Sequence, residues 1–148
     1  MKVLVDANVV LDVLLDHQPH FAASVAVWSA SETGTAQGQL AAHAVATIHF
    51  LIRREHGAAE ARKALSLLPR VFGVAPVDEG IIREAFELQV VGLFGPTTEL
   101  HSPDFEDSVT AVAAQRAGCD LIVTRDPKGF RGSLVSVLAP EAAAPLLG

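Results

Sequence analysis

The 148-residue sequence has few aromatic residues, a single cysteine and no long apolar run. Phe, Trp and Tyr together make up 5% of the residues and Tyr is absent, so a core must be built mainly from Ala, Val and Leu. Hydrophobic residues make up 50% of the chain, which is enough to bury a core in one domain spanning residues 1–148. The single Cys119 excludes an internal disulfide and a cysteine metal cluster, and we interpret it as a packing residue.

The absence of certain sequence features also narrows the class of protein. No apolar run reaches the ~18 residues of a membrane span, and the N-terminus enters an apolar segment without the features of a signal peptide. The formal charge of −6 argues against broad, nonspecific coating of nucleic acid. A local basic rim beside an acidic site would still suit a nucleic-acid enzyme. We therefore expect a soluble, cytoplasmic protein that makes no membrane contact.

Segments typical of strands and of helices alternate along the chain. Short apolar runs predict buried parallel strands, and apolar residues at helical spacing predict the helices between them. The predicted strands are residues 2–6, 39–42, 71–75, 121–124 and 134–138. The predicted helices are residues 8–15, 20–31, 45–55, 58–68, 79–91 and 104–117. This alternation predicts a three-layer α/β/α sandwich with a mostly parallel sheet of about five strands.

Three further features concern the ends of these elements. Pro69 is expected to end the helix that begins at residue 58. The segment 91–103 is predicted to be an unusually long loop, a feature that is typical of functional or mobile segments. The Ala- and Pro-rich tail, residues 140–148, is expected to be loosely held.

Four aspartates lie where predicted strands end or a helix begins. Asp6 closes the first strand, Asp104 and Asp107 open a late helix, and Asp126 follows the fourth apolar run. Ligands of α/β sheets bind beyond the carboxyl ends of the strands, so these carboxylates are positioned to converge on one pocket. Carboxylate oxygens suit Mg²⁺ or Mn²⁺, and such a site would support metal-assisted phosphodiester hydrolysis.

Each of these residues also has an ordinary structural role open to it. Asp6 would make a good helix cap, Asp104 and Asp107 would complement a helix dipole, and Asp126 suits a turn. Thr124 would equally be an ordinary hydroxyl at the edge of a strand. Asp104 and Asp107 share one helix face, where two negative charges repel unless a cation lies between them. The metal interpretation therefore depends on the set and not on any one member.

Three motifs that contain these acids carry a family resemblance. They are Val5-Asp6-Ala7-Asn8-Val9, Asp104-Phe105-Glu106-Asp107 and Ile122-Val123-Thr124-Arg125-Asp126-Pro127-Lys128-Gly129-Phe130. In order and spacing they resemble the PIN domain, and in particular the VapC-type toxins of bacterial toxin-antitoxin modules. Each motif alone is weak, but their combination is specific and spans essentially the whole chain.

The resemblance implies a Mg²⁺- or Mn²⁺-dependent endoribonuclease. By similarity, Asp6, Asp107 and Asp126 match metal-site acids and Asp104 is a further catalytic candidate. Asn8 and Thr124 match polar residues that line the same pocket. The implied partners are an RNA substrate, a small antitoxin that occludes the pocket, and a second copy of the chain in a homodimer formed through apolar helices.

The third predicted helix departs from the family pattern. Many PIN nucleases carry a glutamate there, whereas this chain has Thr47, so one carboxylate of the site would be missing or the chain would belong to a distinct subtype. His43 and His49 flank this position and are interpreted as core or supporting residues. His17 and His20 are interpreted as exposed loop histidines, because Pro19 between them interrupts helical spacing.

Three basic residues follow the fourth predicted strand, and two other functional classes remain open. Arg125, Lys128 and Arg131 are predicted to guide the phosphate backbone of RNA, although a solvated loop with scattered charge fits them equally. A catalytically weak or inactive PIN-fold RNA-binding or regulatory module is the main alternative, favoured by Thr47 and the net charge. A haloacid-dehalogenase or receiver-type domain is disfavoured, because Asp6-Ala7-Asn8 lacks a second acid and Lys128 is poorly placed.

Overall fold

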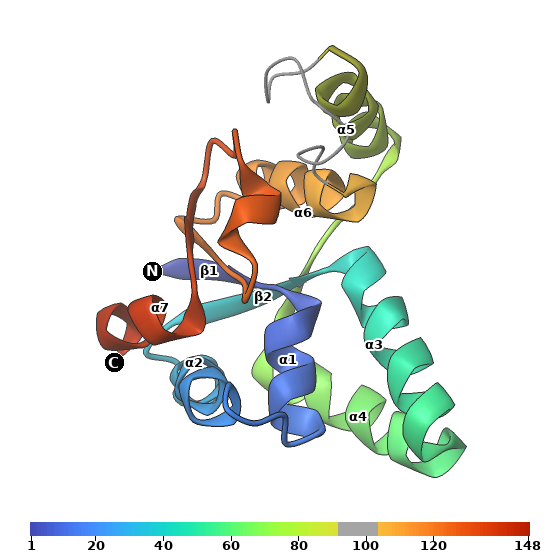
Figure 1. The fold of residues 1–148 in the computed structure, drawn as a ribbon, viewed down its shortest axis with the longest axis vertical. Helices are drawn as coiled ribbons and strands as arrows, with labels where there is room; N and C mark the ends of the chain where they lie inside the picture. The colour runs from blue at the N-terminus through green and yellow to red at the C-terminus, as the bar shows by residue number, and fades with distance from the viewer. Residues whose placement is uncertain (92–103) are drawn as a thin grey trace.

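The computed structural model describes residues 1–91 and 104–148, and its five strands form one parallel sheet. Their order across the sheet is β3-β2-β1-β4-β5, and the neighbouring strands β1 and β2 are labelled in Figure 1. The strands are β1 (Lys2–Val5), β2 (Gln37–Ala41), β3 (Gly73–Ala75), β4 (Leu121–Val123) and β5 (Ser136–Leu138). Each lies within or next to a predicted run, so the predicted parallel sheet is confirmed.

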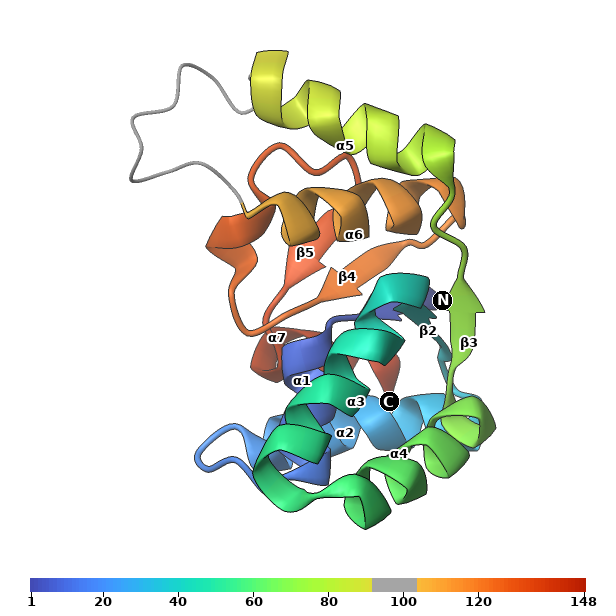
Figure 2. The same cartoon turned by 90° about the vertical axis from the view of Figure 1, so that its right-hand side faces the viewer.

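Helices cover both faces of the sheet, which confirms the three-layer α/β/α sandwich. One layer holds α5 (Glu79–Val91) and α6 (Phe105–Arg116), and the remaining helices lie on the opposite side (Figure 2). These are α1 (Ala7–Leu14), α2 (Phe21–Thr33), α3 (Ala42–His56), α4 (Ala58–Val71) and α7 (Pro140–Leu147). A short 3-10 helix, η2 (Pro127–Phe130), follows β4. Within the two described ranges, no helix has the length and apolarity to cross a membrane.

The core is built from aliphatic strands and small helical residues. Leu4, Leu40 and Ile122 on three neighbouring strands are fully buried, as expected when both faces of a parallel sheet are covered. On α6, Ala113 and Ala114 are also completely buried, and their small side chains let the helix approach the sheet closely. The scarcity of aromatic residues is thus matched by close packing of small ones.

The strand order places the ends of β1 and β4 side by side at the middle of the sheet. The chain leaves β1 toward β2 through one helical layer and reaches β4 through the other, so β1 and β4 flank a topological switch point. Val5 pairs with Val123 in the parallel register. Asp6 and Thr124, the next residues of each chain segment, therefore emerge together at the carboxyl end of the sheet.

The predictions for Pro69 and for the C-terminal tail, residues 140–148, are wrong. Pro69 does not end its helix: α4 continues to Val71, because Leu68 and Val71 are buried and a proline in the last turn removes only one hydrogen bond. The tail is not loosely held. It forms α7, which Pro140 opens, and Ala143 and Leu147 bury its inner face. The predicted long loop lies in residues 92–103, outside the described residues.

Gly38 in β2 provides a test of how closely α2 packs on the sheet. A Cβ at this position would meet the side-chain oxygen of Ser31 and would lie 2.8 Å from Cδ1 of Phe72. We expect Gly38→Ala to destabilise the fold by about 2 kcal/mol, because overpacking a close contact forces its neighbours apart. Chemical denaturation measures the change. Gly80→Ala is the matched control, since its Cβ would meet only Asp78 Oδ1 at 3.4 Å. Equal stability of the two variants would contradict the packing described here.

Candidate active site

The buried hydroxyl of Thr124 connects three of the predicted site residues. Its Oγ1 donates to Asp6 Oδ2 at 2.7 Å. The same oxygen accepts from Asn8 Nδ2 and from the backbone nitrogen of Asp126, each at 3.2 Å. One donor and two lone pairs are all that a hydroxyl offers, so Thr124 uses its full capacity here. The structure thus brings Asp6, Asn8 and Asp126 together around the end of β4.

Asp6 caps a helix and also faces the site. Its Oδ1 accepts from the backbone nitrogen of Ala7 at 2.8 Å, as the N-cap of α1, while Oδ2 faces Thr124. Burial raises the pKa of Asp6, and the hydrogen bonds from Thr124 and Ala7 oppose that rise. The structural role foreseen for this residue and its place beside the other acids are therefore compatible.

Asp107 lies among four other acidic residues whose charges act on it. It lies in the first turn of α6, and its pKa is raised to about 7, first by burial and then by the charges of Asp6, Asp104, Asp126 and Glu106. Asp104 is the N-cap of the same helix and accepts from the backbone nitrogen of Glu106 at 3.3 Å. Acids from β1, α6 and the loop after β4 consequently act on one another, as the predicted convergence requires.

Gly129 lies against two of the predicted metal-site acids. A Cβ built on this glycine would be 2.5 Å from Asp107 Oδ2 and 3.2 Å from Asp126 Oδ2. The backbone nitrogen of Gly129 donates to the carbonyl oxygen of Asp126 at 3.1 Å, which closes the turn of η2. The absence of a side chain lets both carboxylates approach the backbone of Gly129, a requirement that the sequence motifs alone do not predict.

Thr47 faces a carboxylate supplied by another helix. Its Oγ1 lies 3.3 Å from Glu106 Oε1, across the interface between α3 and α6, and also 3.3 Å from the carbonyl oxygen of His43, so its single proton is shared between two acceptors. His43 Nε2 lies 3.9 Å from the same oxygen and 3.2 Å from Thr110 Oγ1. Burial lowers the pKa of His43, which favours the neutral imidazole. Glu106 therefore lies beside the position where an acid of α3 was expected.

Sequence reasoning missed the role of Glu106. The residue was visible in Asp104-Phe105-Glu106-Asp107, but only the two aspartates were assigned to the site. Its charge raises the pKa of both Asp6 and Asp107. The available signal was its position one residue from Asp107 in the first helical turn, where a side chain borders the same end of the sheet.

Only part of the predicted basic rim, Arg125, Lys128 and Arg131, is free of ion pairs among the described residues and so available to bind phosphate. Arg125 Nε lies 3.4 Å from Oδ2 of Asp12, a carboxylate that is completely buried, so its charge is partly neutralised within the protein. Lys128 and Arg131 are exposed, and among the described residues neither forms an ion pair. Asp12 was also missed by sequence reasoning, although it is the one charged residue within the apolar α1.

The chemistry of the acidic residues fits a hard divalent cation. The donors are carboxylate oxygens, and a cation would offset the repulsion that raises the pKa of Asp107. In the conformations described for residues 1–91 and 104–148, no group of three or more His, Cys, Asp and Glu side chains could hold a metal ion. The carboxylates would therefore have to rotate toward a common centre to surround one.

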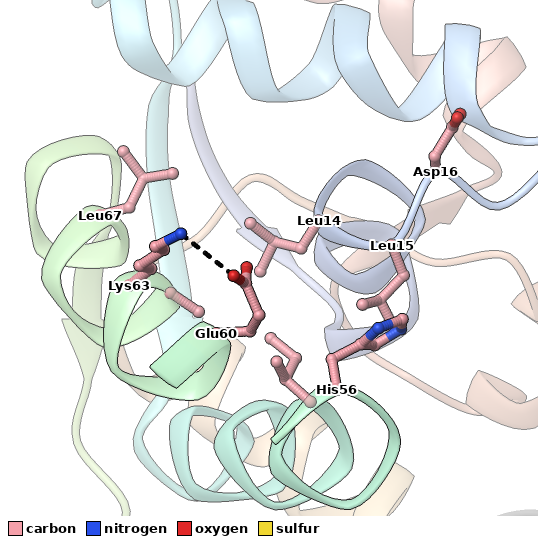
Figure 3. Close-up of a pocket in the computed structure, with 9 residues that line it drawn as sticks. Leu14, Leu15, Asp16, His56, Glu60, Lys63 and Leu67 are labelled. Carbon is pink, nitrogen blue, oxygen red and sulfur yellow. Dashed lines mark hydrogen bonds and ion pairs between the residues drawn. The ribbon is translucent and has the colours of Figure 1, made fainter. Parts of the chain in front are cut away.

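A separate cavity of about 440 Å³ lies between α1, α3 and α4, away from these acids (Figure 3). Apolar side chains including Leu14, Leu15 and Leu67 line it. Glu60 and Lys63 form an ion pair of 3.1 Å at its edge. None of the predicted site residues contributes to its lining, so the cavity is not part of the acidic site.

Comparison with known proteins identifies the family. The fold is an α/β domain with acidic residues at its topological switch point, and the PIN domain model matches residues 2–128. The chain therefore belongs to the PIN domain family. No curated protein sequence matches it significantly.

Several solved structures share this fold at low sequence identity. VapBC2 from Rickettsia felis, bound to a promoter DNA fragment, has a TM-score of 0.68 and 11% identity, over 94% of this chain and 98% of that one. FitAcB from Neisseria gonorrhoeae has a TM-score of 0.66 and 18% identity, over 93% and 97%. The sarcin-ricin loop cleaving toxin VapC20 from Mycobacterium tuberculosis has a TM-score of 0.63 and 15% identity, over 81% and 86%. At these identities the similarity concerns the fold.

Gly129→Ala tests whether two carboxylates need the space beside this glycine. The added Cβ would displace Asp107 or Asp126, so we expect the affinity for Mn²⁺ to fall by about 10-fold while the protein remains folded. Isothermal calorimetry measures the affinity. The control is again Gly80→Ala, which should bind Mn²⁺ like the wild type. Unchanged affinity in Gly129→Ala would show that the glycine does not shape the site.

The raised pKa of Asp107 predicts how the metal-free protein responds to pH. Because its folded-state pKa is about 7 and its ordinary value is 3.8, its contribution to stability is present below pH 3.8 and is lost as pH rises through about 7. We expect Asp107→Asn to stabilise the metal-free protein at pH 8 by about 1 kcal/mol, allowing for solvent screening, and to add little at pH 5.

Thermal unfolding in EDTA at the two pH values measures this difference. Glu87→Gln is the control, since it removes one negative charge from an exposed position on α5. An equal gain from Glu87→Gln would mean that net charge and not local crowding is relieved. No gain from Asp107→Asn at pH 8 would contradict the crowding itself.

Proposed function

We propose that this chain is a Mg²⁺- or Mn²⁺-dependent endoribonuclease that acts as the toxin of a toxin-antitoxin module. The observation that carries the proposal is the gathering of Asp6, Asp104, Asp107 and Asp126 near the carboxyl ends of β1 and β4, where burial and then the charges of the neighbouring acids raise the pKa of Asp107 to about 7. A site that concentrates negative charge in this way favours a divalent cation. Membership of the PIN domain family and the sarcin-ricin loop cleaving toxin VapC20 among its structural neighbours support the same function.

In this proposal the protein's own residues hold and orient the reacting groups. Asp6, Asp107 and Asp126 would hold the cation, and Asp104 would complete the acidic site. Thr124 fixes one oxygen of Asp6 by its hydrogen bond, and Asn8 holds Thr124 in turn. When bound, the cation would lower the pKa of a water molecule and stabilise negative charge on the phosphoryl oxygens. No protein nucleophile is required.

Several side chains around the acids suit an RNA substrate. Lys128 is exposed in η2 and would contact the phosphate backbone, while Thr47 would line the pocket. Phe86 and Phe105 stack with ring centroids 5.0 Å apart, and both are exposed next to the acidic turn of α6. Exposed aromatic rings are surfaces on which unpaired bases stack. These features favour a single-stranded segment of RNA as the substrate.

The proposed protein partner is a small antitoxin. VapC20 among the structural neighbours is a toxin, and we infer that this chain has a corresponding antitoxin. A basic side chain of the antitoxin would pair with the carboxylates and so block access of the cation or the RNA. We further propose that the chain forms a homodimer.

A PIN-fold RNA-binding or regulatory module with little or no activity is the second candidate. Two observations favour it: Thr47 stands where an acid was expected, and no three of the described metal-binding side chains are arranged around an ion. Such a module would bind single-stranded RNA without cleaving it. Cleavage and binding must therefore be measured on the same protein.

Cleavage of a fluorogenic single-stranded RNA tests the proposed function directly. We expect cleavage that requires Mn²⁺ or Mg²⁺ and that falls by about 100-fold or more in Asp6→Asn and Asp107→Asn, since loss of even an outer-shell partner costs roughly 10- to 100-fold. Asp16→Asn, the same substitution in the turn after α1, is the matched control and should retain full activity.

Three results would decide against the proposal. Cleavage that persists in EDTA or in both site variants would come from another source. Binding of the RNA by the wild type without cleavage in either metal would identify the inactive module. Loss of activity in Asp16→Asn to the same degree would remove the link to the acidic site.

A further inference from the structure

We propose that Asp12 is a positioning residue. Its ion pair with Arg125, the residue directly before Asp126, holds in place the loop that carries Asp126. The inference rests on the proposed function, because Asp126 matters there as a metal-site acid. It assigns a role to the one carboxylate in α1, which contributes nothing to the acidic site itself. We name the two contacts that Asn8 and Asp12 make with Arg125 the α1 clamp.

Asp12 is completely buried, yet both of its oxygens have partners. Oδ2 accepts from Ser24 Oγ at 2.9 Å and lies 3.4 Å from Arg125 Nε. Oδ1 lies 3.3 Å from Nδ1 of His17, a loop histidine that is also partly exposed. A buried carboxylate without such partners would strongly destabilise a protein of this size. Burial of Asp12 is therefore tolerated because the guanidinium of Arg125 lies beside it.

The α1 clamp holds both ends of one residue. Asn8 and Asp12 are four residues apart and lie on the same face of α1. Asn8 Oδ1 accepts from the backbone nitrogen of Arg125 at 3.2 Å, and Asp12 pairs with the guanidinium of the same residue. One helix face thus fixes the main chain and the side chain of Arg125 together.

Asp126 depends on its neighbours for its placement. Its backbone nitrogen donates to Thr124 Oγ1 and its carbonyl oxygen accepts from Gly129, but its exposed carboxylate makes no hydrogen bond among the described residues. The peptide immediately before it belongs to Arg125. Fixing Arg125 therefore restricts the direction in which the carboxylate of Asp126 can point, which matters because the acids must turn toward a common centre.

A purely structural ion pair would make a different prediction. In that case Asp12 and Arg125 would only connect α1 and α2 to the end of β4, and their loss would lower overall stability without a selective effect on the loop. The α1 clamp instead predicts local loosening of residues 125–129 and weaker cation binding. The two ideas are separated by a measurement that resolves the loop from the rest of the fold.

Amide hydrogen exchange of the metal-free protein provides that measurement. We expect Asp12→Asn and Arg125→Met to raise the exchange rates of residues 125–129 by about 10-fold, with smaller changes in α2 and α3. Arg125→Lys keeps the charge and should restore part of the protection. Ser24→Ala is the matched control: it removes a hydrogen bond to the same carboxylate but leaves Arg125 paired, so residues 125–129 should exchange as in the wild type.

Calorimetric titration with Mn²⁺ of the same variants measures the consequence for the site. Asp12→Asn and Arg125→Met should each weaken binding several-fold, and the double variant should bind no more weakly than either, because both changes break one interaction. Ser24→Ala should bind like the wild type. If Asp12→Asn does not fold, Arg125→Met and Arg125→Lys carry the test, since Arg125 is partly exposed.

Two results would overturn the α1 clamp. One is unchanged exchange at residues 125–129 in the folded variants. The other is an equal increase in Ser24→Ala, which would indicate general loosening of α1 and α2. Failure of the proposed function is distinguishable, because a wild type that binds no Mn²⁺ would refute the metal site while the exchange data still decide the clamp.

Discussion

The fold brings several carboxylates close together, where they repel one another. The parallel register of β1 and β4 brings Asp6 to the end of the sheet, and α6 and the loop after β4 add Asp107 and Asp126. Three separate segments thus place like charges together, and burial followed by the repulsion of these charges raises the pKa of Asp107. A divalent cation bound among these carboxylates would offset their repulsion and so raise the stability of the fold. The same crowding that destabilises the metal-free protein therefore favours the proposed chemistry.

The protein holds these acids mainly with neutral groups. Thr124 binds Asp6 through a hydroxyl, Thr47 does the same for Glu106, and Gly129 leaves room beside Asp107. A cationic side chain in any of these places would neutralise an acid and compete with a metal ion. Arg125, which directly precedes Asp126, is instead paired with Asp12 on α1. Negative charge is therefore preserved at the site while its supporting loop is fixed from outside.

The sequence predicted the architecture well, because apolar runs and helical periodicity are local signals that the buried sheet reinforces. Its errors at Pro69 and at the tail arose where burial of Val71 and Leu147 overrode a local preference. The placement of Asp6 and Thr124 followed from parallel strands, since residues after paired strands must emerge together. Glu106, Asp12 and Gly129 could not be assigned in this way, because their roles depend on contacts between segments far apart in the chain.

The central claim is that these carboxylates form one cation site. Anomalous diffraction from crystals of the full chain grown with Mn²⁺ tests it most directly, because the ion's position is observed independently of activity. The account predicts an anomalous peak within coordination distance of carboxylate oxygens of Asp6, Asp107 and Asp126, at about 2.0 to 2.2 Å. A peak elsewhere, or none at millimolar Mn²⁺ with the three side chains well ordered, would contradict it.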